Sequence, residues 1–184
     1  LYVMGANEWR DEYEWPLART QFTKYYLHSD GMANGLEGDG RLSTDCPKTE
    51  LPDQYDYDPT NPTPTIGGAT CCTPEHLDWG SFDQRPSERR PDVLVYTSDS
   101  LQEDLEVTGP VVVKLYAGSD VLDTDFTAKL IDVYPDGYAR NLCDGIIRAR
   151  YRESQEYQVL LNPGEIYEYT IDLWATSNVF KKGH

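Results

Sequence analysis

The chain has 184 residues and carries 32 acidic against 16 basic side chains, which gives a formal net charge of −16 at pH 7. This length suits one domain, because a single hydrophobic core usually serves about 150 residues. The acid excess leaves no basic stripe to neutralise phosphates, which argues against nucleic acid and membranes as partners. With 39 % hydrophobic residues but no run near the ~20 apolar residues of a membrane span, the composition is that of a folded, soluble protein.

The first 90 residues contain few stretches that could form long regular elements. Turn-forming pairs such as Asn34-Gly35 and the proline-rich run 58–64 interrupt them repeatedly. Short strands are expected around Phe22–His28 and Arg41–Ser43. This half is therefore predicted to be an ordered wrap that contains only a few strands.

From residue 91 onward the pattern changes to strand, turn and strand. Val93–Tyr96 is a short apolar run rich in β-branched residues, and residues 111–117 alternate between apolar and polar or exposed positions. The run 126–134 ends at Pro135-Asp136-Gly137, where Pro presets φ and Gly supplies a positive φ. A hairpin is predicted at that turn.

Two further stretches alternate with a period of two. Residues 147–152 would place three arginines on one face of a strand, and residues 167–173 form another strand after the turn signal at 162–164. Short strands between turns, with almost no 3.6-residue periodicity, predict an all-β fold of low helix content, namely a jelly-roll β-sandwich.

No catalytic motif emerges from the sequence. An α/β-type serine hydrolase needs Gly-x-Ser-x-Gly at its nucleophile, and the nearest serine, Ser119, lacks the second glycine and a following helical pattern. His28, His76 and His184 lie in sequence surroundings that specify no general base. We therefore assign no catalytic residue within this chain.

Metal and cofactor sites are not predicted either. The pairs Asp56/Asp58 and Asp123/Asp125 could place two acids on one strand face, as in a Ca²⁺ site or a glycosidase, but the calcium-loop pattern fails at its sixth and twelfth positions. The histidines are too scattered for zinc. Without a Cys-x-x-Cys motif, we interpret the cysteines as reduced, partly buried thiols of a cytoplasmic protein. They are Cys46, Cys71, Cys72 and Cys143.

A series of motifs nevertheless matches one known region in order. Among them are Glu8-Trp9-Arg10, Asp83-Gln84-Arg85-Pro86 and Asp123-Thr124-Asp125-Phe126-Thr127. The full series comprises residues 3–10, 14–17, 26–28, 38–43, 57–59, 64–68, 83–86, 90–98, 105–110, 123–130, 133–137, 144–152 and 175–180. It resembles the C-terminal, non-catalytic region of the Xaa-Pro dipeptidyl-peptidase and cocaine-esterase-like serine hydrolases, which include glutaryl-cephalosporin acylases and α-amino acid ester hydrolases.

The resemblance implies a larger enzyme that cleaves esters or amides with a Ser-His-Asp triad. Residues 1–20 would be the tail of an α/β-hydrolase domain, with its last strand and a linker, and residues 21–184 a galactose-binding-like jelly roll without its last strands. The whole triad would precede Leu1, so this chain alone is expected to be inactive. Its partner would be the catalytic domain of the same polypeptide, and open sheet edges could also join two copies.

The resemblance also assigns residues to sites. In some relatives the segment after the Gly-Gly pair forms apolar walls of the acyl pocket, which here makes Thr70, Cys71 and Cys72 candidates for a substrate-facing wall. An arginine in a loop among carboxylates can donate five hydrogen bonds and lock a crossing between sheets. We accordingly assign a structural role to Asp83, Arg85, Arg90 and Asp125.

Two other functions remain open. A galactose-binding-like fold could be a carbohydrate-binding module, with tryptophans stacking on sugars, although Trp174 in an alternating strand and Trp15 before a proline fit a core or an interface better. The tryptophans are Trp9, Trp15, Trp79 and Trp174. A metal enzyme built on the acidic pairs is the least favoured alternative.

Overall fold

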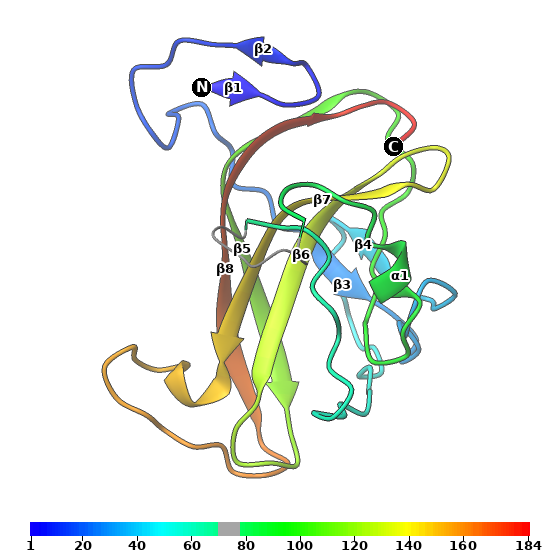
Figure 1. Ribbon diagram of the computed structural model, residues 1–184, viewed down its shortest axis with the longest axis vertical. Coiled ribbons are helices and arrows are strands. Elements are labelled where there is room, and N and C mark those ends of the chain that lie inside the picture. The colour runs from blue at the N-terminus through cyan, green and yellow to red at the C-terminus, as the bar shows by residue number, and fades with distance from the viewer. Residues whose placement is uncertain (70–77) are drawn as a thin grey trace.

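The computed structural model describes residues 1–69 and 78–184, and its regular elements are mainly antiparallel strands (Figure 1). In chain order the elements are β1 (Tyr2–Val3), β2 (Glu8–Trp9), β3 (Tyr26–His28), β4 (Arg41–Ser43), α1 (Arg85–Glu88), β5 (Leu105–Gly118), β6 (Asp125–Val133), β7 (Ala139–Arg148), the 3₁₀ helix η1 (Ala149–Tyr151) and β8 (Ile166–Phe180). The predicted β character and low helix content are confirmed, since α1 has four residues and η1 three. Among the described residues, no helix has the length and apolar character needed to cross a bilayer.

The longest ladder joins β5 and β8, which pair antiparallel from Leu105 opposite Phe180 to Gly118 opposite Ile166. Within β8 the predicted alternation is clear, because Tyr169, Ile171 and Leu173 are buried while the residues between them are exposed. A strand with one apolar face must bury that face against another layer. The β5–β8 pair therefore forms one wall of the core.

The second wall is the β6–β7 hairpin, which confirms the predicted turn at residues 135–137. Gly137 has φ +81°, and the N–H of Tyr134 donates to the carbonyl of Tyr138 at 2.9 Å. At Gly145, β7 passes so close to β8 that a Cβ would lie 2.1 Å from the carbonyl oxygen of Asp172. The core between the walls contains Phe126, Ala149, Leu161, Tyr169, Ile171 and Leu173.

The remaining ladders are short. In the described residues the strands pair only as β1–β2, β3–β4, β5–β8 and β6–β7, which does not by itself define a jelly roll. The β1–β2 hairpin attaches to the body through a bridge between Met4 and Asn178, and Val3 is fully buried there. Arg10 adds a bidentate pair with Glu106 of β5, at 2.6 and 3.1 Å.

Two strands predicted before residue 100 differ from the structure: one is absent and the other is shorter than expected. Val93–Tyr96 is not a strand, because its residues pair singly with a loop: the N–H of Gly35 donates to Val93, and the N–H of Val95 to Ala33, each at 2.8 Å. The strand expected over Phe22–His28 is restricted to Tyr26–His28, where Arg41–Ser43 pairs with it.

The strand expected over residues 147–152 ends at Arg148 and continues as η1. The carboxylate of Asp123 captures the backbone N–H of Arg150 at 3.0 Å, and the N–H of Ala149 donates to the carbonyl of Thr124 at 2.8 Å. These bonds turn the chain, so the arginines do not continue one strand face. Arg152 instead donates to the carbonyl of Val159.

Candidate functional site

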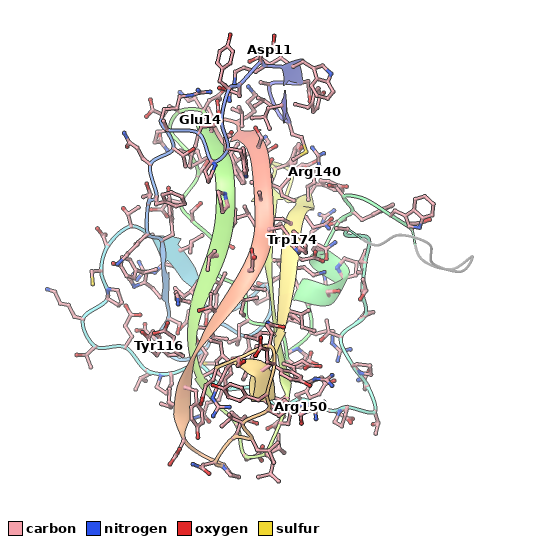
Figure 2. The ribbon with its side chains drawn as sticks, turned by 90° about the vertical axis from the view of Figure 1, so that its left-hand side faces the viewer. Asp11, Glu14, Tyr116, Arg140, Arg150 and Trp174 are labelled. Carbon is pink, nitrogen blue, oxygen red and sulfur yellow. The ribbon has the colours of Figure 1, made fainter. Side chains whose placement is uncertain are left out.

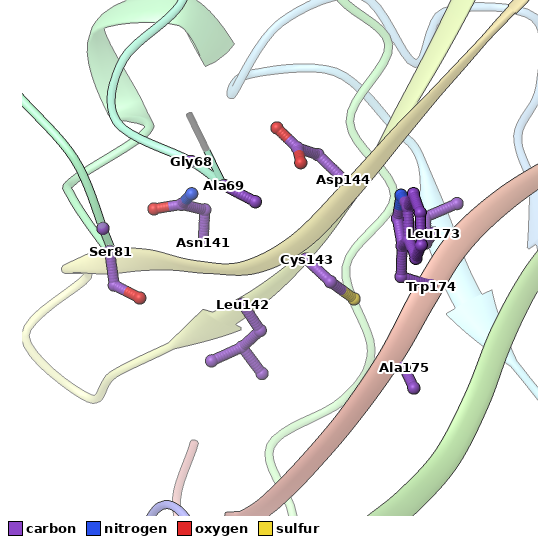
Figure 3. A pocket seen from close by; sticks show the side chains of 11 residues that line it. Gly68, Ala69, Ser81, Asn141, Leu142, Cys143, Asp144, Leu173, Trp174 and Ala175 are labelled. Atoms are coloured by element: carbon purple, nitrogen blue, oxygen red, sulfur yellow. The ribbon is translucent and has the colours of Figure 1, made fainter. Parts of the chain in front are cut away.

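A cavity of about 240 Å³ lies where β7 and β8 meet the two segments on either side of residues 70–77 (Figure 3). Its walls come from residues 68–69, 80–81, 141–144 and 173–175. It therefore joins parts of the chain that are more than a hundred residues apart.

Two glycines frame one side of the cavity. Gly68 and Gly80 exchange backbone hydrogen bonds of 2.7 and 3.1 Å, and both have φ +102°, in a region that favours glycine. A Cβ on Gly68 would lie 3.0 Å from Oδ2 of Asp144. The glycine pair thus joins the segments at residues 68 and 80 and places Gly68 directly against β7.

A buried polar network supports the β7 side. Gln84 is 1 % exposed; its amide donates to the carbonyls of Ile66 and Phe82 at 2.9 and 3.1 Å and accepts from Nζ of Lys129 at 2.7 Å. Lys129 lies opposite Asp144 in the ladder. Burial lowers the pKa of Lys129, and the charge of Asp144 opposes that shift. The network fixes β6 and β7 behind the cavity wall.

Trp174 forms the β8 side, at a bulge. The ladder changes register between Pro110 and Val112, and Trp174 has φ +66°, which is uncommon for a bulky residue. The backbone N–H of Trp174 donates to Oδ1 of Asp172 at 2.8 Å. The side chain is 78 % exposed, and Figure 2 labels it beside β8.

Trp174 is therefore not a core residue of this chain, contrary to that part of the sequence-based expectation. Trp15, for which the sequence also favoured a core or an interface, is 49 % exposed. Both side chains remain available to a ligand or to another domain.

The cysteine in the cavity wall is not a nucleophile. Burial, with the nearby charge of Asp144, raises the pKa of Cys143 to about 11. The thiol is therefore neutral at pH 7, and only a thiolate attacks readily. Cys46, on the surface, is also a free thiol.

The predicted pocket-wall residues Thr70, Cys71 and Cys72 lie outside the described residues. Ala69, immediately before them, lines the cavity. The assignment of these three residues to a pocket wall stays a prediction.

Asp83 and Arg85 pair with each other in the segment that leads into α1. Nε and Nη2 of Arg85 donate to the Asp83 carboxylate at 2.6–3.0 Å, and the same carboxylate accepts the N–H of Ala139 at 3.3 Å. The Arg85 guanidinium outweighs burial and lowers the pKa of Asp83. The pair thus links α1 to the start of β7.

Arg90 and Asp125 also take part in ion pairs, and neither lines the cavity. Arg90 donates to both oxygens of Asp92, at 2.8 and 2.7 Å, and to the carbonyl of Asn61 at 2.7 Å. Asp125 accepts two bonds from Arg148 across the β6–β7 ladder, at 2.8 and 3.0 Å. These contacts connect backbone segments outside the cavity between β7 and β8.

One arrangement was not anticipated. His28 is buried, with Nδ1 2.7 Å from Oε1 of Glu50 and Nε2 3.1 Å from Oγ of Ser43. An acid, an imidazole and a hydroxyl in this order resemble a hydrolase triad, but Oγ of Ser43 also accepts the N–H of Asp45 in the turn after β4. We therefore interpret the Glu50–His28–Ser43 arrangement as structural, because it connects β3, β4 and the segment after them. Its members are 7 to 22 residues apart and leave no local sequence signal.

Within residues 1–69 and 78–184, no three side chains of the metal-binding types come close enough together to hold an ion. The side chains of the cavity that can contribute to binding are the half-buried carboxylate of Asp144, the exposed indole of Trp174 and the neutral thiol of Cys143. That set can bind a small ligand, and it contains no activated nucleophile.

Comparison with known proteins identifies the domain. Residues 1–184 match the family described as the X-Pro dipeptidyl-peptidase C-terminal non-catalytic domain. A cocaine esterase from Rhodococcus sp. is 51 % identical over 184 residues, which are all of this chain and 32 % of that protein. A putative serine esterase from Mycobacterium bovis is 30 % identical over 210 residues, covering all of this chain and 30 % of the relative.

Solved structures agree with these relatives. An aminopeptidase from a marine sediment Thaumarchaeota archaeon matches all of this chain and 30 % of its own, with a TM-score of 0.83 and 31 % identity. An α-amino acid ester hydrolase matches with a TM-score of 0.78 and 28 % identity, again over all of this chain and 31 % of that one. The chain spans about a third of the length of the relatives that it matches. It belongs to the family of X-Pro dipeptidyl-peptidase C-terminal non-catalytic domains.

Proposed function

We propose that this chain acts as the non-catalytic C-terminal domain of an α/β-fold serine hydrolase that cleaves esters or amides. The observation that carries the proposal is the match over residues 1–184 to a domain described as non-catalytic, in relatives named as an esterase, an aminopeptidase and an ester hydrolase. The chain covers only 30–32 % of those relatives. The triad would lie in the remaining part of the protein.

Packing on a catalytic domain is the proposed structural role. The rings of Tyr2 and Trp9 contact each other at a tilt of 59°, with centroids 5.4 Å apart, and Trp9 is 80 % exposed. Exposed aromatic residues of this kind favour a further partner surface.

A jelly roll of the galactose-binding type is the finer fold that we propose. Its support is that the β5–β8 and β6–β7 pairs are both antiparallel and share one core. This topology would place β5, β6, β7 and β8 in two facing sheets.

The direct test is turnover by this chain with and without the rest of the protein. A p-nitrophenyl ester and an alanyl-prolyl anilide would serve as ester and amide substrates. We expect no turnover by the 184-residue chain and restored turnover when the remaining part is supplied. Robust hydrolysis by the chain alone, abolished by Ser43→Ala, would overturn the proposal.

The proposed pocket wall at Thr70–Cys72 has its own test in the full-length enzyme. Replacing Cys71 or Cys72 with Leu narrows the space for the acyl group, and one methylene in such a pocket changes specificity by roughly 10-fold or more. We expect the ratio of kcat/KM for long against short acyl esters to fall by about that factor. The control is Cys46→Leu, at an exposed cysteine; an equal change there would refute the assignment.

A further inference from the structure

We propose that the cavity between Asp144 and Trp174 binds an organic cation, through an ammonium or guanidinium group. This inference goes beyond the proposed function, because it concerns a ligand of this domain and requires no catalytic domain. Both side chains line the same cavity, one from β7 and the other from β8 (Figure 3).

The carboxylate of Asp144 supplies the charge. It is half-buried and, among the described residues, accepts no hydrogen bond and forms no ion pair. Lys129, opposite Asp144 in the ladder, interacts with its charge, while the ammonium of Lys129 donates a hydrogen bond to Gln84. A carboxylate has about four acceptor positions, and half-burial restricts how many of them water can reach. A cation that enters the cavity would satisfy those positions.

Trp174 supplies the second half of the site. Among the aromatic side chains, indole attracts a cation on its face most strongly. The bulge and the positive φ hold this large side chain outward, at 78 % exposure. Bulges commonly redirect a side chain next to a functional site, and backbone strain is commonly found at such sites. The positive φ of Trp174 therefore favours a binding role for this side chain over exposure without a function.

The rest of the cavity narrows the class of ligand. The described residues that line the cavity include no lysine, arginine or histidine, so none of them provides a positive charge for an anion. A volume of about 240 Å³ is below that of pockets for drug-sized ligands. The net charge of −16 also attracts cations. These features fit a small cationic head group.

The test is titration of the 184-residue chain with choline, followed by amide chemical shifts and indole fluorescence. The neutral analogue 3,3-dimethylbutan-1-ol has the same shape without the charge. We expect saturable choline binding that is at least about fivefold tighter than binding of the neutral analogue, since a cation–π contact contributes about that factor. Asp144→Asn and Trp174→Leu should each weaken choline binding by a similar factor.

Two matched variants separate this site from general effects of charge or exposure. Trp9→Leu removes another exposed indole, and Asp125→Asn removes another strand carboxylate; both should leave choline binding unchanged. If Asp144→Asn lowers the cooperativity of unfolding, Trp174→Leu alone decides, because an exposed side chain is not needed for folding. Equal binding of the neutral analogue, no saturation, or preferential binding of galactose would overturn the proposal.

The source of the cation can be distinguished by repeating the titration in the full-length protein. Choline binding to both forms would indicate a free amine as the ligand. Binding to the isolated chain but not to the full-length protein would indicate an arginine or lysine of the catalytic domain in the cavity. Absence of binding to the isolated chain contradicts the inference while leaving the proposed function intact.

Discussion

Residues 105–180 and residues 1–104 are held together by different interactions. In the C-terminal part, two antiparallel ladders supply the backbone hydrogen bonds, and one apolar core lies between them. In the N-terminal part the strands have only two or three residues. There, side chains connect segments that no ladder joins.

Asp53 is the clearest example of such a connection. Its carboxylate accepts hydrogen bonds from Ser29 Oγ at 2.7 Å, from the N–H of Ala33 at 2.8 Å and from Tyr96 Oη at 2.7 Å. One side chain thus joins three segments. A fold can replace ladders with charged acceptors, but each acceptor then matters individually.

The largest effect should come from the C-terminal core. Ile171→Ala removes a side chain that is 1 % exposed, and such truncations cost about 2–5 kcal/mol of unfolding free energy. Urea denaturation of the purified chain measures it. Val112→Ala on the partner strand, at 51 % exposure, should cost less than about 1 kcal/mol. Similar losses at both positions would show that the apolar core does not dominate this half.

Asp53→Asn should have the next largest effect and probes the N-terminal part. In the wild type, three donors face carboxylate oxygens of Asp53, whereas the amide of the variant would present an NH₂ group to some of them. Since hydrogen bonds to a charged group are lost, we expect the free energy of unfolding to fall by about 2 kcal/mol. Thermal unfolding measures the loss. The control is Asp56→Asn, a nearby exposed aspartate, which should unfold like the wild type. A wild-type result for Asp53→Asn would remove the basis of the comparison.

The same variant should change the acid sensitivity. Burial alone would raise the pKa of Asp53, but the hydrogen bonds from Ala33, Tyr96 and Ser29 outweigh it and lower the pKa below 3.8. A lowered folded-state pKa stabilises the protein above the unfolded value, and this stability is lost as the pH falls through the folded value. Unfolding measured from pH 6 down to pH 2 should therefore show a shallower decline below about pH 4 in Asp53→Asn than in the wild type.

The two halves also differ in how much their sequences predict. Alternation over 111–117 and 167–173 marks β5 and β8 because each residue's face follows from the backbone period of two. The hairpin at Pro135 is equally local. In contrast, the bond from Tyr96 to Asp53 spans 43 residues, and the bonds that replace the expected strand at Val93–Tyr96 reach a distant loop. No local pattern encodes such contacts.

The candidate site was predictable only in part for the same reason. The Gly67-Gly68 pair marked one edge of it, but the cavity assembles four distant segments. For Trp174, its place in an alternating strand favoured a core or an interface. The bulge in β8 and the φ of +66° hold the side chain outward instead, and neither feature has a local sequence signal.

A smaller effect is expected at Arg90. Lysine cannot reproduce the two parallel bonds to Asp92 together with the bond to the carbonyl of Asn61. Arg90→Lys should therefore lower the thermal midpoint by about 2–4 °C. Arg89→Lys is the control, since the neighbouring exposed arginine makes no side-chain bond to the described residues. Equal midpoints for the two variants would mean that the charge alone is sufficient at position 90.

The smallest effect should arise on the outer face of the β5–β8 ladder. Glu168 accepts hydrogen bonds from Lys114 and Tyr116 at 2.8 and 2.7 Å, but Lys114 and Glu168 are 56 % and 44 % exposed, and exposed ion pairs contribute little. Glu168→Gln should shift the thermal midpoint by less than about 2 °C, and the shift should disappear in 1 M salt because the charges are screened. Hydrogen bonds to a half-buried carboxylate that joins separate segments, such as Asp53, should contribute more to stability. A shift at Glu168 as large as that of Asp53→Asn would show that the number of bonds, rather than their burial and the segments they join, determines stability in both halves.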